Sequence, residues 1–315
     1  MPVFSIFETM KNFKFFVQLV SITLLISSFG SKAQTPNPLK NPVYFSVEEA
    51  IAANKATQLN LRDQHLFSVS NKIGELKYLQ FLNLMGNNIS KWDKELFNLK
   101  KLNNLNLKSN SLSYLPKEIE NLKSLQTLDV AHNNIANLPV EIKNLKSLKN
   151  LHLSLNLLTS IPKELGNCTN LEVLELANNQ LSYLPIEINQ LKNLRLLHLG
   201  FNQFNELEGE WIALKNLKEL NLEHNQLKSF DADITALKNL KSLILNDNKL
   251  EELPQALTKI LSLEMLILTN NKLKKLPDNL DSLENLRTLI ALNNNFSEEE
   301  KVRIKKQLPN CKVYL

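Results

Sequence analysis

Glycine and cysteine are both scarce in this sequence. Only six of the 315 residues are glycine, and no glycine-rich loop that could cradle a phosphate group is present. The two cysteines, Cys168 and Cys311, limit the chain to one internal disulfide. The net charge of +5 is too small to indicate nucleic-acid binding by itself. With 43% hydrophobic and 22% charged residues, the composition is that of an ordinary folding chain.

The first 33 residues have the features of a secretory signal peptide. Two lysines precede the apolar stretch 15–26, and Ser31 and Ala33 supply the small residues expected before a cleavage site. Met10 suits such a signal better as a start than the first residue does. An uncleaved membrane anchor is the alternative, although the stretch is short for a membrane span. We expect a secreted, periplasmic or cell-envelope protein, with no membrane span in the mature chain.

From residue 56 the sequence repeats every 23 residues. The frame is L-x-x-L-x-L-x-x-N-x-L, and we number positions 1 to 23 through each copy. Leu79, Leu82, Leu84 and Asn87 occupy positions 1, 4, 6 and 9 of one copy. The first copy has Gln64 at position 9. Eleven copies follow one another without insertion, beginning at residues 56, 79, 102, 125, 148, 171, 194, 217, 240, 263 and 286.

Each copy has two apolar faces that it cannot bury alone, so neighbouring copies must stack. The L-x-L alternation predicts a short strand with its leucines pointing inward. Later apolar positions, such as Ile119 and Leu122, close the back of the coil. The asparagine at position 9 lies where the chain turns out of the strand. Its amide can bond to backbone groups of the turn, so a buried asparagine ladder is expected.

This pattern resembles the leucine-rich-repeat family over residues 56–296. The Leu115-Pro116 pair of the back turn is similar to the 23-residue subclass of plant Ras-group and bacterial repeats. The resemblance implies an α/β solenoid, a right-handed horseshoe with a parallel sheet on its concave side and short helical or irregular segments on its convex side. Three copies depart from the Leu-Pro pattern, at Trp92-Asp93, Leu207-Glu208 and Phe230-Asp231.

Helical caps are expected at both ends of the repeats. Residues 46–55 open with an S-x-x-E capping box, and residues 297–315 carry the same motif. Such covers keep a solenoid from exposing its core. Residues 34–45, with three prolines, are expected to form a stiff linker.

The repeat frame also places the cysteines. Cys168 replaces a back-face leucine, and Cys311 falls in the final cap about six strands away. At about 4.8 Å per strand the gap is about 29 Å. A disulfide needs Cα atoms within about 7 Å, so two separate buried thiols are expected.

Positions 3, 5, 7 and 8 face outward from the strands and are the candidates for partner contact. Their charged residues are two basic and six acidic, which argues against nucleic acid on this face. Position 5 carries an acid–imidazole series on consecutive strands, Asp129, His152, Glu175 and His198. Three interpretations stay open: a mutually hydrogen-bonded polar face, a pH-sensitive recognition surface, or a metal site on His152, Glu175 and His198.

Position 5 of the last three copies is isoleucine. Ile244, Ile267 and Ile290, beside Met265, are expected to form an exposed apolar patch of the kind that marks contact sites. Stacked isoleucines also suit parallel strands for structural reasons alone. Leu155 and Phe201 at position 8 are further candidate anchors.

No catalytic constellation stands out, so we expect a non-enzymatic, monomeric recognition protein without a cofactor. Its partner is expected to be a protein, with a glycan as the second candidate and nucleic acid not expected. A metal-binding or metal-dependent hydrolytic site on the acid–imidazole series is the alternative, and a purely structural spacer is a third class. The predicted contact residues on the concave face are Asp129, His152, Glu175, His198, Phe201, Glu219, Glu223, His224, Ile244, Met265, Ile267 and Ile290.

Overall fold

The computed structural model describes residues 41–207, 213–229 and 234–315. The chain divides into two compact units, residues 1–35 and 36–315, and the second contains all the repeats. The expected signal peptide, 1–33, lies outside the described residues, as do most of the expected linker and parts of two departures from the Leu-Pro pattern. Among the described residues, no helix combines the length and the apolar character that crossing a membrane requires.

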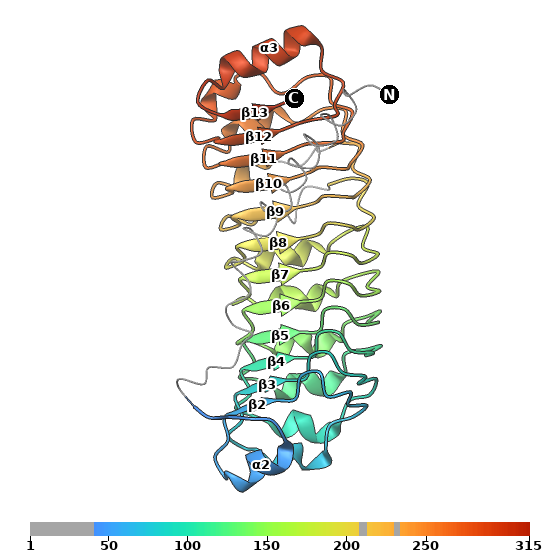
Figure 1. The fold of residues 1–315 in the computed structure, drawn as a ribbon. Coiled ribbons are helices and arrows are strands. Elements are labelled where there is room, and N and C mark those ends of the chain that lie inside the picture. Colours follow the sequence, from blue (N-terminus) through green and yellow to red (C-terminus); the bar gives the residue numbers. More distant parts are fainter. Residues whose placement is uncertain (1–40, 208–212, 230–233) are drawn as a thin grey trace, which may run out of the picture. The chain divides into compact units, whose positions relative to one another are not determined.

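One parallel sheet of 13 strands runs through the repeat unit, with its strands in chain order (Figure 1). From β2 to β12 each residue pairs with the residue 23 positions later, as Leu82 does with Leu105. The register therefore follows the sequence repeat directly. The strands are β1 (Val43–Tyr44), β2 (Gln58–Asn60), β3 (Phe81–Asn83), β4 (Asn104–Asn106), β5 (Thr127–Asp129), β6 (Asn150–His152), β7 (Val173–Glu175), β8 (Leu196–His198), β9 (Glu219–Asn221), β10 (Ser242–Ile244), β11 (Met265–Ile267), β12 (Thr288–Ile290) and β13 (Lys312–Tyr314).

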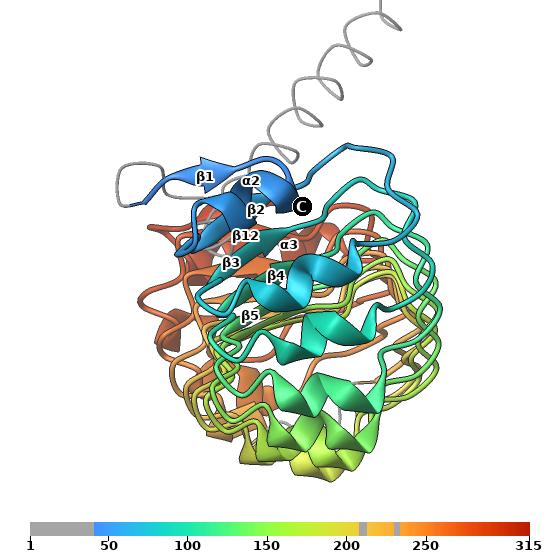
Figure 2. The same ribbon diagram turned by 90° about the horizontal axis from the view of Figure 1, so that it is seen from below.

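Short 3₁₀ helices form the outer side of the coils, away from the strands (Figure 2). Five of them begin after a proline such as Pro116, whose fixed φ suits the extended backbone before the helix. The 3₁₀ helices are η3 (Asn71–Glu75), η4 (Lys94–Asn98), η5 (Lys117–Asn121), η6 (Val140–Asn144), η7 (Lys163–Asn167), η8 (Ile186–Gln190), η9 (Ile234–Ala236), η10 (Gln255–Lys259) and η11 (Leu280–Ser282).

The core is the continuous row of repeat leucines and isoleucines, and the asparagine ladder predicted beside it is confirmed. In one copy, the Asn179 Nδ2 donates to the backbone oxygens of Leu153 (3.1 Å) and Leu176 (3.0 Å). Its Oδ1 accepts the backbone N–H of Leu158 at 3.0 Å. The same three bonds recur along the stack. Each asparagine thus pairs backbone groups of its own copy with those of the preceding copy, which locks the two coils together.

Both ends carry a helix that begins with a capping box. Ser46 Oγ accepts the N–H of Glu49 before α2 (Val47–Ala52), and Ser297 Oγ accepts that of Glu300 before α3 (Glu298–Gln307). The interpretation of 34–45 as a linker is wrong at its end, where β1 pairs with β2. The strand forms there because β2 would otherwise leave an unpaired edge.

The two cysteines are separate thiols, as predicted. Cys168 is fully buried, and its Sγ lies 3.2 Å from the backbone oxygen of Ile142. Burial raises the pKa of each thiol to about 11. The expectation that both are buried is wrong for Cys311, which is only half-buried because it follows the last helix at the end of the stack.

Candidate functional site

The acid–imidazole series lies along the middle of the sheet, on β5 to β8, and its first two members are buried. Asp129 is 2% exposed and His152 is 5% exposed, whereas Glu175 and His198 are half-buried. A position-5 side chain has position-5 neighbours on both adjacent strands and positions 3 and 7 of its own strand beside it. Asp129 and His152 therefore lie too deep to meet a partner directly, contrary to the expectation of an open polar ladder.

Each histidine of the series is hydrogen-bonded to a glutamate on the next strand. His152 Nδ1 lies 2.8 Å from Glu175 Oε2, and His198 Nε2 lies 2.6 Å from Glu219 Oε1 on β9. His152, Glu175 and His198, the three side chains of the alternative metal site, thus engage two different pairs instead of one common point. Across the described ranges, no group of three or more histidine, cysteine or acidic side chains is arranged to hold a metal ion.

Electrostatics couple the first pair. Burial lowers the pKa of His152, but the hydrogen bond and charge of Glu175, together with the charge of Asp129, outweigh burial, and the His152 pKa is raised. Burial alone would raise the pKa of Glu175. The hydrogen bond to His152 and the charges of His152 and His198 together outweigh burial, so the Glu175 pKa is lowered. Both shifts favour the charged form of the pair over the neutral form. The Nε2 of His152 is buried without a hydrogen-bond partner.

The isoleucine patch predicted on the last strands is not exposed. Ile244, Ile267 and Ile290 are between 2% and 4% exposed, and Met265 beside them is half-buried. They stack on one another along β10, β11 and β12 and so cover the centre of the sheet. The polar position-5 residues do the same on β5 to β8. The prediction of an open apolar contact site at these residues is wrong, because parallel strands bring branched side chains into mutual contact.

Position 8 of the repeat has an unusual backbone that the frame alone did not reveal. From Asp63 to Asn293 every residue there has positive φ, between +48° and +71°. Its N–H still bonds to the next copy, as Phe201 N does to Glu223 O at 2.9 Å. Glycine, asparagine and aspartate tolerate this left-handed region best. These residue types recur at position 8 of the sequence, and that recurrence is the signal that could have predicted the left-handed backbone. We call the side chains at this position the edge row.

Two apolar residues occupy left-handed positions in the edge row. Leu155 has φ +57° and is 47% exposed, and Phe201 has φ +56° and is 43% exposed. The Phe201 ring stacks on the imidazole of His224, with centroids 4.1 Å apart and planes at 18°. Only Asn178 separates Leu155 from Phe201 along the row. The edge row therefore presents two apolar groups, two repeats apart, beside the sheet.

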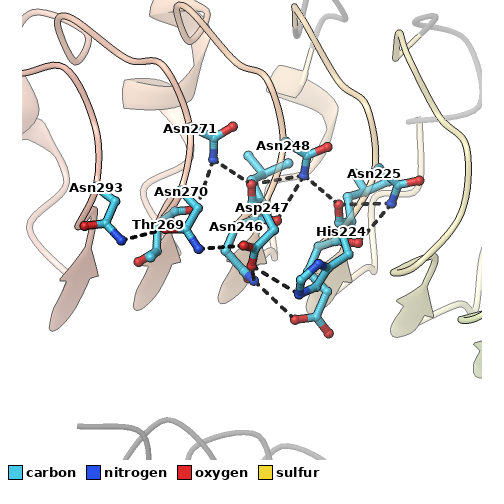
Figure 3. A network of polar contacts seen from close by, with 12 residues as sticks. His224, Asn225, Asn246, Asp247, Asn248, Thr269, Asn270, Asn271 and Asn293 are labelled. Carbon is cyan, nitrogen blue, oxygen red and sulfur yellow. Dashed lines mark hydrogen bonds and ion pairs between the residues drawn. The ribbon is translucent and has the colours of Figure 1, made fainter. Parts of the chain in front are cut away.

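A chain of polar contacts continues the edge row from Phe201 (Figure 3). His224 Nε2 lies 3.2 Å from Asp247 Oδ2. The other oxygen of Asp247 accepts Asn270 Nδ2 at 2.6 Å, and Asn270 Oδ1 accepts Asn293 Nδ2 at 2.7 Å. Asn246 Nδ2 also donates to Asp247 Oδ2, at 2.6 Å. These contacts fix four successive edge side chains relative to one another.

The remaining predicted acid, Glu223 at position 7, lies between the sheet centre and the edge row. Its Oε1 accepts Asn221 Nδ2 at 2.9 Å, and it is half-buried. Of the predicted contact residues, Phe201 and His224 are the ones that the structure leaves exposed. The accessible candidate site is therefore the edge row, with Glu219, Glu223 and the two hydrogen-bonded His–Glu pairs on the sheet beside it.

Comparisons with known proteins agree with this geometry. Residues 92–213 match a family model described as a leucine-rich repeat region, and residues 192–250 match a leucine rich repeat. A leucine-rich-repeat protein of Leptospira interrogans has a similar structure, with 36% sequence identity and a TM-score of 0.69. The match covers 87% of this chain and 81% of that one. The chain belongs to the leucine-rich-repeat family.

Two further solved structures share the horseshoe. A TDR receptor is 28% identical with a TM-score of 0.74, over 87% of this chain and 50% of that chain. The Toll–Spätzle complex of Drosophila contains a chain 22% identical with a TM-score of 0.63, over 77% of this leucine-rich-repeat protein and 38% of that chain. Comparison with curated proteins gives no match.

Proposed function

We propose that this protein is a non-enzymatic recognition protein, secreted or held in the cell envelope, that binds a protein partner through the edge row of its sheet. The observation that carries the proposal is the placement of Leu155 and Phe201. Both are exposed, and both hold a left-handed backbone at a position where six of the other nine copies have glycine, asparagine or aspartate and the remaining three have serine or histidine.

Neither residue is explained by folding. A left-handed backbone costs an ordinary residue about 1–2 kcal/mol relative to the right-handed region. Leu155 and Phe201 leave nearly half of their surface exposed, so packing of the core does not require an apolar side chain at either position. Strain retained at exposed positions is a reason to infer function, and apolar side chains are the common anchors of protein interfaces.

The surroundings suit a preformed interface. His224 packs on the Phe201 ring, and the polar chain through Asp247, Asn270 and Asn293 holds its own side chains in place. A surface ordered before binding loses little side-chain freedom on association. Similar folds occur in a receptor and in a complex of two proteins, which supports a protein as the partner class.

The test is a double substitution, Leu155→Asn with Phe201→Asn. Asparagine accepts the left-handed backbone at lower cost, so the variant should unfold within about 1 kcal/mol of the wild type or be more stable. Immobilised wild-type protein should retain a partner from the envelope or extracellular fraction of its source, identified by mass spectrometry. The double variant should retain at least tenfold less.

The matched control is Val140→Asn with Ile186→Asn. These apolar residues are similarly exposed but lie on the outer η6 and η8. Partner retention by this control should equal that of the wild type. If the edge-row variant retained as much partner as the wild type, the proposal would be contradicted. If both double variants lost the partner equally, the loss could not be assigned to the edge row.

A further inference from the structure

A row of lysines lies at the opposite ends of the strands from the edge row. The chain makes a tight turn at positions 22 and 23 of each repeat, just before it returns to the sheet. Position 22 is lysine in seven of the first eight copies, and all seven side chains are exposed. We call these the basic row: Lys77, Lys100, Lys123, Lys146, Lys192, Lys215 and Lys238.

Side-chain hydrogen bonds hold the turns of the basic row in register. Asn170 Nδ2 donates to Lys146 O at 2.8 Å, Asn216 Nδ2 to Lys192 O at 2.7 Å, and Asn239 Nδ2 to Lys215 O at 2.8 Å. The residue at position 23 of one copy thus binds the turn of the copy before it. Position-22 residues of adjacent copies are spaced as the strands are, about 4.8 Å apart, so the basic row extends over about 34 Å with one gap at Thr169.

The carboxylates nearest to the basic row pair with other cations, so they do not neutralise the charge of its lysines. Glu172 lies 3.5 Å from Arg195, and Glu264 lies 2.6 Å from Lys241, both of which flank the row at position 2. Within the described ranges, none of the seven lysines has a carboxylate at ion-pair distance. The basic row concentrates positive charge along one line, on a chain in which six of the eight charged residues at the outward strand positions are acidic.

Neutral groups beside the basic row favour a sugar polymer over other anions. The exposed amides of Gln80 and Gln126 lie at position 2 and suit sugar hydroxyls. Tyr78 is exposed next to Lys77, with Lys101 Nζ 4.5 Å from its ring centroid. A hollow between η5 and η6 opens beside Lys123 and Lys146 and is lined by the amides of Asn121 and Asn144. Glu120 also lines it, and its carboxylate accepts Asn144 Nδ2 at 2.6 Å.

We propose that the basic row binds an elongated acidic glycan. A glycan with acidic groups along one chain matches a line of cations that is broken once, at Thr169, and has the amides of Gln80 and Gln126 beside it. A nucleic-acid duplex instead presents two phosphate rows, and a membrane presents a plane. Because the basic row precedes the strands and the edge row follows them, the protein can bind an acidic glycan and a protein partner at the same time.

The test measures binding of a galacturonate decamer and a heparin decasaccharide, with a fully methyl-esterified galacturonate decamer as the uncharged probe. Replacing Lys123, Lys146, Lys192 and Lys215 with glutamine should weaken binding of the acidic oligosaccharides at least tenfold. The dependence of the binding constant on salt should also become shallower, because fewer counterions are released. The uncharged decamer should bind neither protein.

The matched control replaces four exposed lysines of the outer 3₁₀ helices, Lys117, Lys143, Lys163 and Lys259, with glutamine. It removes the same charge and should change affinity less than about twofold if the row itself is the site. Equal weakening by both variants would overturn the proposal, as would no binding of either acidic oligosaccharide at low salt. Tighter binding of a 20-base-pair DNA duplex, or of vesicles containing phosphatidylglycerol, would replace the glycan with that partner.

Discussion

At the residue scale, the asparagine at position 9 performs the same task in nearly every copy. Asn179 spans two coils: its amide donates to the buried carbonyls of Leu153 and Leu176, and its oxygen accepts the buried N–H of Leu158. No other side chain of similar size has a paired donor and acceptor on one planar group. The ladder therefore limits what can replace the asparagine, even though most of the surrounding core is plain leucine.

Substituting Asn179 with alanine should destabilise the protein by about 2–4 kcal/mol. The buried N–H of Leu158 loses its partner, and the carbonyls of Leu153 and Leu176 each lose one of the two amides that they accept. Urea unfolding followed by circular dichroism measures the change. Gln180→Ala is the control, because Gln180 is exposed one residue away. It should shift the unfolding free energy by less than about 0.5 kcal/mol. Similar shifts in the two variants would show that the ladder bonds are not what matters.

The asparagine ladder and the leucine core could be predicted from the sequence, because the 23-residue spacing of these residues determines which of them lie in contact. The exposed fraction of the outward side chains of the sheet could not be predicted in this way. Alternation tells inside from outside, but it does not tell that Asp129 and Ile267 are covered by their neighbours on adjacent strands. Nor does it tell that His198 turns to Glu219 on the next strand while His152 turns to Glu175. Those choices depend on side-chain rotamers, which a repeat frame leaves open.

At the element scale, β6 and β7 are joined by more than their backbone ladder. Their His152–Glu175 pair is protected from water and faces Asp129 on β5, His198 on β8 and the charge of Lys108 after β4. Because folding raises the His152 pKa, the pair's contribution is complete below the unfolded histidine pKa and is lost as pH rises through the folded value. Because folding lowers the Glu175 pKa, the contribution is also lost as pH falls through that value.

Glu175→Gln should therefore cost more stability at pH 6 than at pH 9. We expect a loss of about 1–3 kcal/mol at pH 6, as for a hydrogen bond between charged groups, and less than half of that at pH 9. Urea unfolding of wild type and variant at both pH values gives the two differences. Glu251→Gln, at an exposed acid, should show no such pH dependence. An equal loss at both pH values would show that the charge of His152 does not change between pH 6 and pH 9.

Arg303 and Glu300 attach the final helix α3 to the backbone of Leu276, in the copy that begins at residue 263. Arg303 Nη2 donates to Leu276 O at 2.7 Å and to Glu300 Oε1 at 2.6 Å. The same Glu300 oxygen accepts the N–H of Leu276 at 2.8 Å. Arg303→Met should loosen α3 by about 2–3 kcal/mol, because charged hydrogen bonds are lost. Hydrogen exchange of the α3 amides should quicken accordingly, while Lys305→Met, at an exposed lysine of the same helix, should leave it unchanged.

At the scale of the whole repeat unit, each coil contacts its neighbours through the same register, and the edge row and the basic row are products of that repetition. Removing one complete copy, residues 102–124, rejoins two copies in frame. In a solenoid, stability is close to a sum over repeats and their interfaces. The shortened protein should therefore fold, with the circular dichroism spectrum of the full chain and a lower urea midpoint.

A second deletion of equal length, residues 171–193, separates folding from recognition. It removes Asn178 and brings Leu155 and Phe201 into adjacent copies, so their separation falls from about 9.6 Å to about 4.8 Å. Both shortened proteins should fold, but only the first keeps the anchor spacing that a rigid partner requires. Partner retention should persist after deletion of 102–124 and fall at least tenfold after deletion of 171–193. Retention by both would show that the partner does not engage Leu155 and Phe201 together.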